Sequence, residues 1–129
     1  MRVSRPFLHV VRIADAVLFW PAAALVIYGE LSSRPERLFF TLFGAINDKV
    51  LHFEAYFVLG AMAAAAFKSR KPVLRAVIGL ILLGGVLEIV QSYVGRDMSI
   101  WDELANTAGA ISGAVIARMM VEPLRRRWV

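Results

Sequence analysis

The chain has 129 residues, 59% of them hydrophobic, and a net charge of +5. Its mean hydropathy of +0.64 exceeds what a soluble domain of this length can hide, because small domains leave much of their surface in water, so we expect one integral membrane domain. The absence of cysteine excludes disulfides and thiolate metal sites, and basic residues that collect at the ends of apolar segments argue against a nucleic-acid partner.

Four apolar segments are each close to the roughly 20 residues that a helix needs to cross hydrocarbon. The first covers about 7–28. Asp15 interrupts this segment, which argues against the alternative of a cleaved signal peptide. In the predicted connection 30–47, we expect the short apolar stretch 37–46 to lie along the membrane interface.

Three further spans cover about 48–67, 73–94 and 100–120. The predicted fold class is therefore all-α, a four-helix transmembrane bundle in a single domain. Basic residues are concentrated at the amino terminus, in the turn after the second span and in the tail, and these regions share one side of a chain with four spans. By the positive-inside rule, both termini are expected to be cytoplasmic.

Small residues recur at every fourth position of the last span, at Ala105, Gly109, Gly113 and Ala117. Such a stripe lets another helix approach closely. We expect the stripe to pack inside the bundle; the alternative is a homodimer through Gly109 and Gly113.

Polar residues occupy the predicted outer ends of the last three spans. His52 follows Asp48 by one helical turn, about 6 Å, and Asn106 follows Asp102 by the same distance. Because ionisable groups in hydrocarbon cost several kcal/mol unless they are paired or wetted, their convergence indicates a site. The candidate site residues are Asp48, Lys49, His52, Tyr56, Glu88, Gln91, Arg96, Ser99, Asp102 and Asn106.

A histidine beside carboxylates can act as a general base or a nucleophile. The candidate catalytic residues are therefore His52, Glu88 and Asp102, with a carboxylate fixing the imidazole tautomer. Lys49 and Arg96 are candidates to bind a phosphate or carboxylate at the rim. The alternative is a buried polar network that only fixes helix register. Nitrogen and carboxylate donors suit zinc or manganese, but this end offers a single histidine, and no metal or other cofactor is predicted.

Three segments carry a family resemblance: DKVLHFEAYFVLG at 48–60, the pair Glu88 and Gln91, and GRDMSIWDELANTAGAISG at 95–113. Together they resemble the VanZ-like family. The resemblance implies a small integral membrane protein, usually of four or five helices, whose motif residues fall on the candidate site residues named above. Gly95 stands where many members have proline. The founding member is associated with reduced susceptibility to teicoplanin.

Three functions are compatible with these observations, all in the bacterial cytoplasmic membrane with the polar site facing outward. The first is an enzyme that acts on a lipid-linked or phosphorylated amphiphile, so that the partner is a membrane lipid or its headgroup. The second is a non-catalytic lipid- or glycopeptide-binding protein that alters envelope susceptibility to antibiotics. The third is an accessory subunit in which the polar residues only hold the bundle together.

Overall fold

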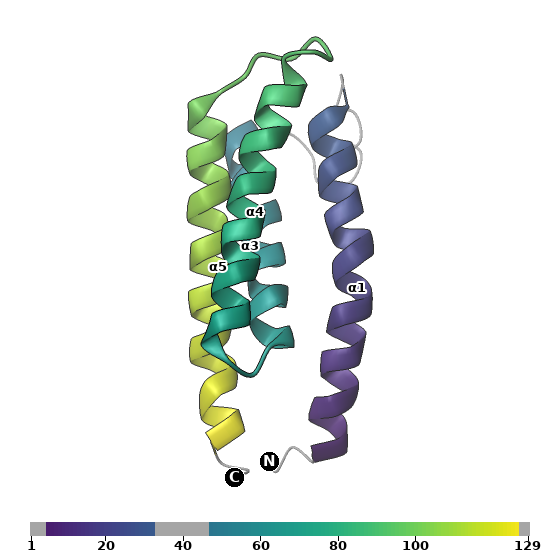
Figure 1. Ribbon diagram of the computed structural model, residues 1–129, viewed down its shortest axis with the longest axis vertical. Coiled ribbons are helices and arrows are strands. Elements are labelled where there is room, and N and C mark those ends of the chain that lie inside the picture. Colours follow the sequence, from purple (N-terminus) through teal and green to yellow (C-terminus); the bar gives the residue numbers. More distant parts are fainter. Residues whose placement is uncertain (1–4, 33–46, 127–129) are drawn as a thin grey trace.

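The computed structural model describes residues 5–32 and 47–126, apart from the side chains of Arg5 and Arg125. Four of its helices are long and apolar enough to cross a membrane, which confirms the predicted all-α four-helix bundle (Figure 1). The predicted interfacial stretch 37–46 lies outside the described residues. The helices are α1 (Arg5–Leu31), α3 (Asp48–Ala66), α4 (Arg70–Gln91) and α5 (Ile100–Arg126).

The carboxyl ends of three helices differ from the predicted spans, and α4 also begins three residues earlier than predicted, at Arg70. α1 continues through Pro21 to Leu31, so the assignment of Glu30 to the connection is wrong. Backbone groups within hydrocarbon must be hydrogen-bonded inside the helix, which favours continuation of α1 up to the membrane boundary. α4 ends at Gln91 because the next residues form turns, whereas α5 continues past the predicted end to Arg126.

The most extensive packing joins α3 to α5. A Cβ added at Gly109 would meet the backbone of Phe53, and one added at Gly113 would meet the backbone of Phe57. The small-residue stripe therefore lets the α5 backbone contact the α3 backbone directly. Because α3 of the same chain covers this stripe, Gly109 and Gly113 are not accessible to a second copy. The homodimer stays a prediction, and the structure does not indicate a surface for it.

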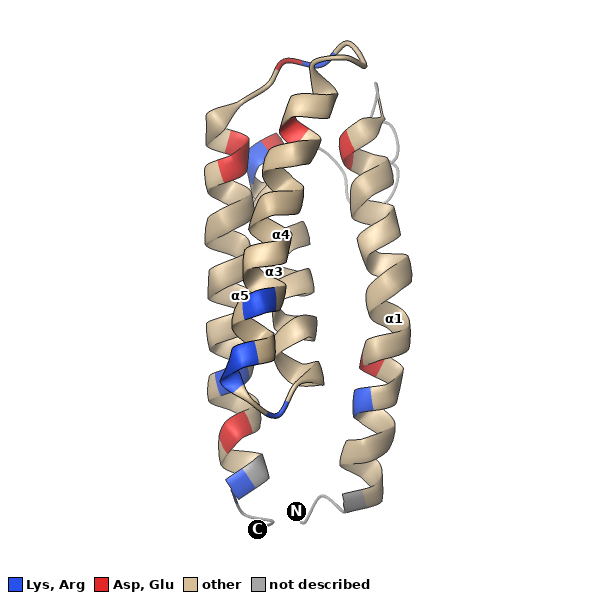
Figure 2. Ribbon diagram, viewed as in Figure 1, with Lys and Arg blue, Asp and Glu red and all other residues tan. Residues whose placement is uncertain are grey.

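The helices alternate in direction, so α1 begins and α5 ends at the same end of the bundle, beside the turn between α3 and α4 (Figure 1). The turn between α4 and α5 lies at the opposite end. Figure 2 shows acidic residues gathered at that opposite end, whereas basic residues predominate towards the end that holds the termini. The bundle is thus electrostatically polarised along its long axis.

Two arginines from other helices donate hydrogen bonds to carbonyl groups at the carboxyl end of α3. Arg12 on α1 donates through Nε to the Ala66 carbonyl at 3.1 Å. Arg118 on α5 donates through Nη1 to the carbonyls of Phe67 and Lys68, at 3.3 and 3.1 Å. Cations are favourable at this position because the last carbonyls of a helix lack intrahelical partners and carry partial negative charge. These contacts tie α1 and α5 to α3 at the basic end, away from the polar site.

Candidate functional site

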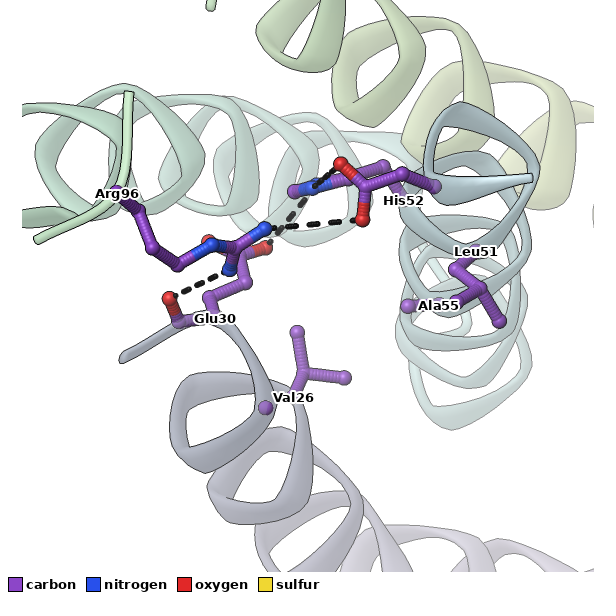
Figure 3. Close-up of a pocket in the computed structure, with 8 residues that line it drawn as sticks. Val26, Glu30, Leu51, His52, Ala55 and Arg96 are labelled. Atoms are coloured by element: carbon purple, nitrogen blue, oxygen red, sulfur yellow. Dashed lines mark hydrogen bonds and ion pairs between the residues drawn. The ribbon is translucent and has the colours of Figure 1, made fainter. Parts of the chain in front are cut away.

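The turn after α4 directs Arg96 back over the acidic end of the bundle. Gly95 has a φ of 84°, a left-handed conformation that glycine adopts without steric cost, and the Arg96 amide donates to the Gln91 carbonyl at 3.1 Å. The Arg96 side chain donates through Nη1 to the Glu30 carbonyl at 3.0 Å, and its Nη2 lies 3.7 Å from Asp48 Oδ1 (Figure 3). This turn therefore links α1 to α3 at the rim of the site.

His52 lies at the centre of the site and is only 5% exposed. Its Nδ1 is 2.9 Å from Asn106 Oδ1; because an amide oxygen only accepts, Nδ1 is the donor in this hydrogen bond. Nε2 lies 3.8 Å from Oδ2 of both Asp48 and Asp102, and Nδ1 lies 3.7 Å from Glu30 Oε1. One imidazole therefore faces an amide and carboxylates from α1, α3 and α5.

Glu103, which was not among the predicted residues, fixes the orientation of Asn106. Asn106 donates from Nδ2 to Glu103 Oε2 at 3.4 Å, which leaves Oδ1 for His52. A Cβ added at Gly84 on α4 would meet the Glu103 carboxylate, the Asn106 amide and the Tyr56 hydroxyl. Gly84 therefore makes room for a polar layer between α3, α4 and α5.

Glu88 connects the end of α4 to the start of α5. Its Oε2 accepts a hydrogen bond from the Ser99 amide at 3.0 Å. The Ser99 carbonyl in turn accepts from the amides of Asp102 and Glu103 in the first turn of α5. Ser99 therefore contributes to the site through its backbone, and Glu88 positions the helix that supplies Asp102.

Lys49 holds the Asp102 carboxylate, with Nζ 2.9 Å from Oδ1. The Lys49 side chain is 52% exposed, whereas that of Asp102 is 6% exposed. Lys49 is in turn placed by the start of α3, where the Asn47 side chain accepts from the Lys49 amide. The pair thus joins a buried acid to a cation that reaches the surface.

Glu30 is the main site residue that the sequence prediction missed. It lies on α1 with 6% exposure, and with Asp48, His52 and Arg96 it lines a small cavity of about 40 Å³ (Figure 3). Glu30 follows Ala23 by seven residues, two turns along the same face of α1, but the burial of that face is seen only in the structure. α1 therefore also contributes a carboxylate to the site, as the other three helices do.

Several buried polar atoms at this end have no hydrogen-bond partner among residues 5–32 and 47–126. They belong to Glu30, Tyr56, Glu88 and Gln91, and all four residues are less than 9% exposed. The Tyr56 hydroxyl and the Glu30 carboxylate lie close enough to interact with each other, so Glu88 and Gln91 carry the atoms that most clearly need a partner. Buried polar groups in proteins are normally bonded. These atoms therefore mark the positions at which a ligand or water would bind.

Two groups of side chains have the donors and spacing to hold a cation. Glu30, His52 and Glu88 form one group, and Asp48, His52 and Asp102 form the other, each with ligand atoms within 4.8 Å of one another. Imidazole and carboxylate donors suit zinc or manganese. Asp48 and Asp102 already face a basic side chain, Arg96 and Lys49 respectively. A bound cation would therefore neutralise more uncompensated negative charge at the group of Glu30, His52 and Glu88. That the site works without a metal stays a prediction.

All the residues proposed from the sequence lie at this end of the bundle, and the structure adds Glu30 and Glu103 to them. No curated protein and no solved structure matches the chain. The family model described as VanZ/LLP1 matches residues 7–121, a range that includes every one of these side chains and extends the resemblance seen in the sequence into α1. The chain belongs to the VanZ/LLP1 family.

Proposed function

We propose that the polar site binds and processes the headgroup of a lipid-linked or phosphorylated amphiphile of the cell envelope. The observation that carries this proposal is the set of buried polar atoms, without partners in the described part of the chain, that surrounds one histidine. Each unsatisfied buried group costs about 1–3 kcal/mol. Ionisable residues inside a membrane are by default functional, and a polar ligand would satisfy these atoms.

His52 supplies acid–base chemistry in this proposal. Its Nδ1–H is held by Asn106, so Nε2 can take a proton from a hydroxyl group or a water molecule. The cavity of about 40 Å³ beside it exceeds the roughly 10–15 Å³ that a water molecule requires. Asp48 and Asp102 face Nε2 and would stabilise the imidazolium that proton transfer creates.

Lys49 and Arg96 are the groups that would hold an anionic headgroup. Both contact protein oxygens, but an ammonium carries three donors and a guanidinium five, so each can bind a further acceptor. The carboxylates at this end outnumber these two cations. A phosphate group would therefore enter together with a proton or a divalent cation. The carboxylates include those of Glu30, Asp48, Glu88, Asp102 and Glu103.

We place this site on the outer side of the cytoplasmic membrane. The described basic residues near the opposite end include Arg12, Lys68, Arg70, Lys71 and Arg118, and Figure 2 shows this bias along the bundle. The positive-inside rule assigns that end to the cytoplasm.

A single cysteine tests this orientation, because the chain has none of its own. Met98→Cys replaces a side chain that is 61% exposed in the turn between α4 and α5. We expect it to react with a membrane-impermeant maleimide added to intact spheroplasts. Ser69→Cys, in the turn between α3 and α4, should react only after permeabilisation. The reverse pattern would contradict the orientation.

A structural role is favoured by a different observation. Lys49 with Asp102, Arg96 with Glu30, and the Ser99 amide with Glu88 connect all four helices. Buried networks of this kind can fix helix register without any ligand. A non-catalytic lipid or glycopeptide binder that alters antibiotic susceptibility would use the same unsatisfied atoms without any reaction.

The direct test is to incubate the purified protein in nanodiscs with extracted bacterial envelope lipids, with and without Mn²⁺ or Zn²⁺. Mass spectrometry of the lipids and assay of free phosphate would follow the reaction. The proposal expects a lipid with an altered headgroup to accumulate only when the protein is present. Lipid binding without product would identify a binder. Absence of both, together with lower thermal stability of Asp102→Asn, would establish the structural role.

A further inference from the structure

A second, larger cavity lies between α1, α3 and α4. Its volume is about 630 Å³, and it is lined by aliphatic and aromatic side chains and glycine. Small residues create this space, because Ala16 and Ala23 on α1 face Ala63 on α3 and Ala76 and Gly79 on α4. Protein interiors rarely leave voids larger than a water molecule. This recess is open on one side, where Trp20 and Phe67 are exposed, so in a membrane it calls for a hydrocarbon occupant.

The cavity continues the face of α1 that forms the polar site. Its lining on α1 runs from Ala16 to Ile27, and the polar cavity begins beside it at Val26 and includes Glu30. The rise from Ala16 to Ile27 is about 16 Å at 1.5 Å per residue, roughly half of the ~30 Å hydrocarbon core of a bilayer. The apolar cavity thus extends about one leaflet deep from the polar site.

The place of the cavity indicates its occupant. Ala23, Ile27 and Glu30 share one face of α1, so a ligand in the cavity would continue directly into the polar site. A methylene group is close in size to a water molecule, whose share of liquid volume is about 30 Å³. The cavity of about 630 Å³ therefore has room for at least about twenty such groups, enough for one acyl or isoprenoid chain.

We propose that this cavity holds one hydrocarbon chain of the lipid whose headgroup occupies the polar site. The inference rests on the proposed function and restricts its substrate class to membrane lipids with an extended chain, as opposed to free water-soluble phosphates. The headgroup lies at the membrane boundary beside Glu30, and the chain runs along α1 towards the bilayer centre, the orientation of a lipid in its own leaflet.

Gly79 provides a way to fill the cavity without disturbing the fold. It lines the cavity, and a Cβ added to it would meet no atom within 4 Å. Gly79→Phe should therefore occupy the space of the chain while the helices keep their positions. Leu82→Phe is the matched control, because Leu82 lies on the same helix, is 65% exposed and does not line the cavity.

The probe is a lysophosphatidic acid of palmitoyl length with a diazirine at the middle of its chain, added to the protein in nanodiscs. After irradiation, peptide mass spectrometry locates the adducts. We expect them on the cavity-lining residues of α1 and α4, and we expect Gly79→Phe to reduce them about tenfold, equivalent to about 1.4 kcal/mol of binding. Leu82→Phe should leave them unchanged. Adducts spread over the outer helix faces, or adducts indifferent to Gly79→Phe, would overturn the proposal.

Two further labelling experiments, both directed at the polar site, distinguish binding of the chain from binding of the headgroup. Asp102→Asn alters the polar site without touching the cavity, and excess glycerol 3-phosphate competes only for the headgroup position. If both reduce cavity labelling, the chain and the headgroup belong to one ligand, as proposed. If neither Asp102→Asn nor glycerol 3-phosphate reduces the labelling of the cavity, the result would support the chain site but contradict the proposed headgroup function.

Discussion

His52→Ala is expected to lower the rate of headgroup conversion by about 10²–10⁴-fold, the usual contribution of a positioned general acid or base. An imidazole can both accept and release a proton through its two ring nitrogens, and His52 is the histidine that the described residues place in the site. His52→Gln should lose a similar amount, because its amide can donate to Asn106 Oδ1 but cannot take up a proton. Initial rates in the nanodisc lipid assay measure both effects.

The chain contains a matched control for this experiment. It has two histidines, and His9 lies exposed on α1 near the opposite end of the bundle. His9→Ala should convert lipid at the wild-type rate. Thermal unfolding of each variant in detergent separates lost chemistry from lost fold. A folded His52→Gln protein that retains more than about a tenth of the activity would show that the imidazole does not transfer the proton.

Gly109→Leu is expected to destabilise the bundle by about 3 kcal/mol or more. An added Cβ already meets the carbonyl of Phe53 on α3, so the larger side chain must force the two backbones apart. Gly109→Ala should cost about 1–3 kcal/mol for the same reason. The displaced helix would also withdraw Asn106, which lies one turn away, from His52. Size-exclusion chromatography and thermal unfolding in detergent report the loss of folded protein.

Gly79→Leu is the control for the glycine experiment. Its added side chain points into open space, so this variant should unfold close to the wild-type temperature although it carries the same chemical change. If Gly109→Leu were as stable as Gly79→Leu, the contact between α3 and α5 would not depend on the small-residue stripe.

Helical periodicity explains why much of the site was predictable. Asp102, Asn106 and Gly109 follow each other at intervals that return to one face of a helix. A glycine stripe must face a neighbouring helix, so the polar residues on the same face were expected inside the bundle. The structure buries Asp102 and Asn106 and places both against His52. The same argument applies to Glu88, which lies one turn from Gly84 on α4 and is buried.

Glu30 and Glu103 could not be placed in this way. The burial of Glu30 depends on how far α1 continues and on which helix it meets, and the polar and proline residues that follow it suggested an earlier end. The place of the Glu103 carboxylate beside Asn106 depends on Gly84, which lies on a different helix. The contact from Arg96 to the Glu30 carbonyl requires the left-handed turn at Gly95. These features arise from tertiary packing and turn geometry, which no single periodic segment encodes.

The central claim is that His52 lies buried among acidic side chains of other helices, and solid-state NMR in bilayers tests it most directly. With His9→Ala, [¹⁵N]histidine labelling leaves one imidazole, whose distances to ¹³C-labelled carboxyl carbons can be measured. Ring nitrogens and carboxylate oxygens are 3.7–3.8 Å apart, and the carboxyl carbon lies about one bond, ~1.2 Å, further. The account predicts ¹⁵N–¹³C dephasing at about 4–5 Å that weakens in Asp102→Asn. An imidazole with no carboxyl carbon within reach would contradict it.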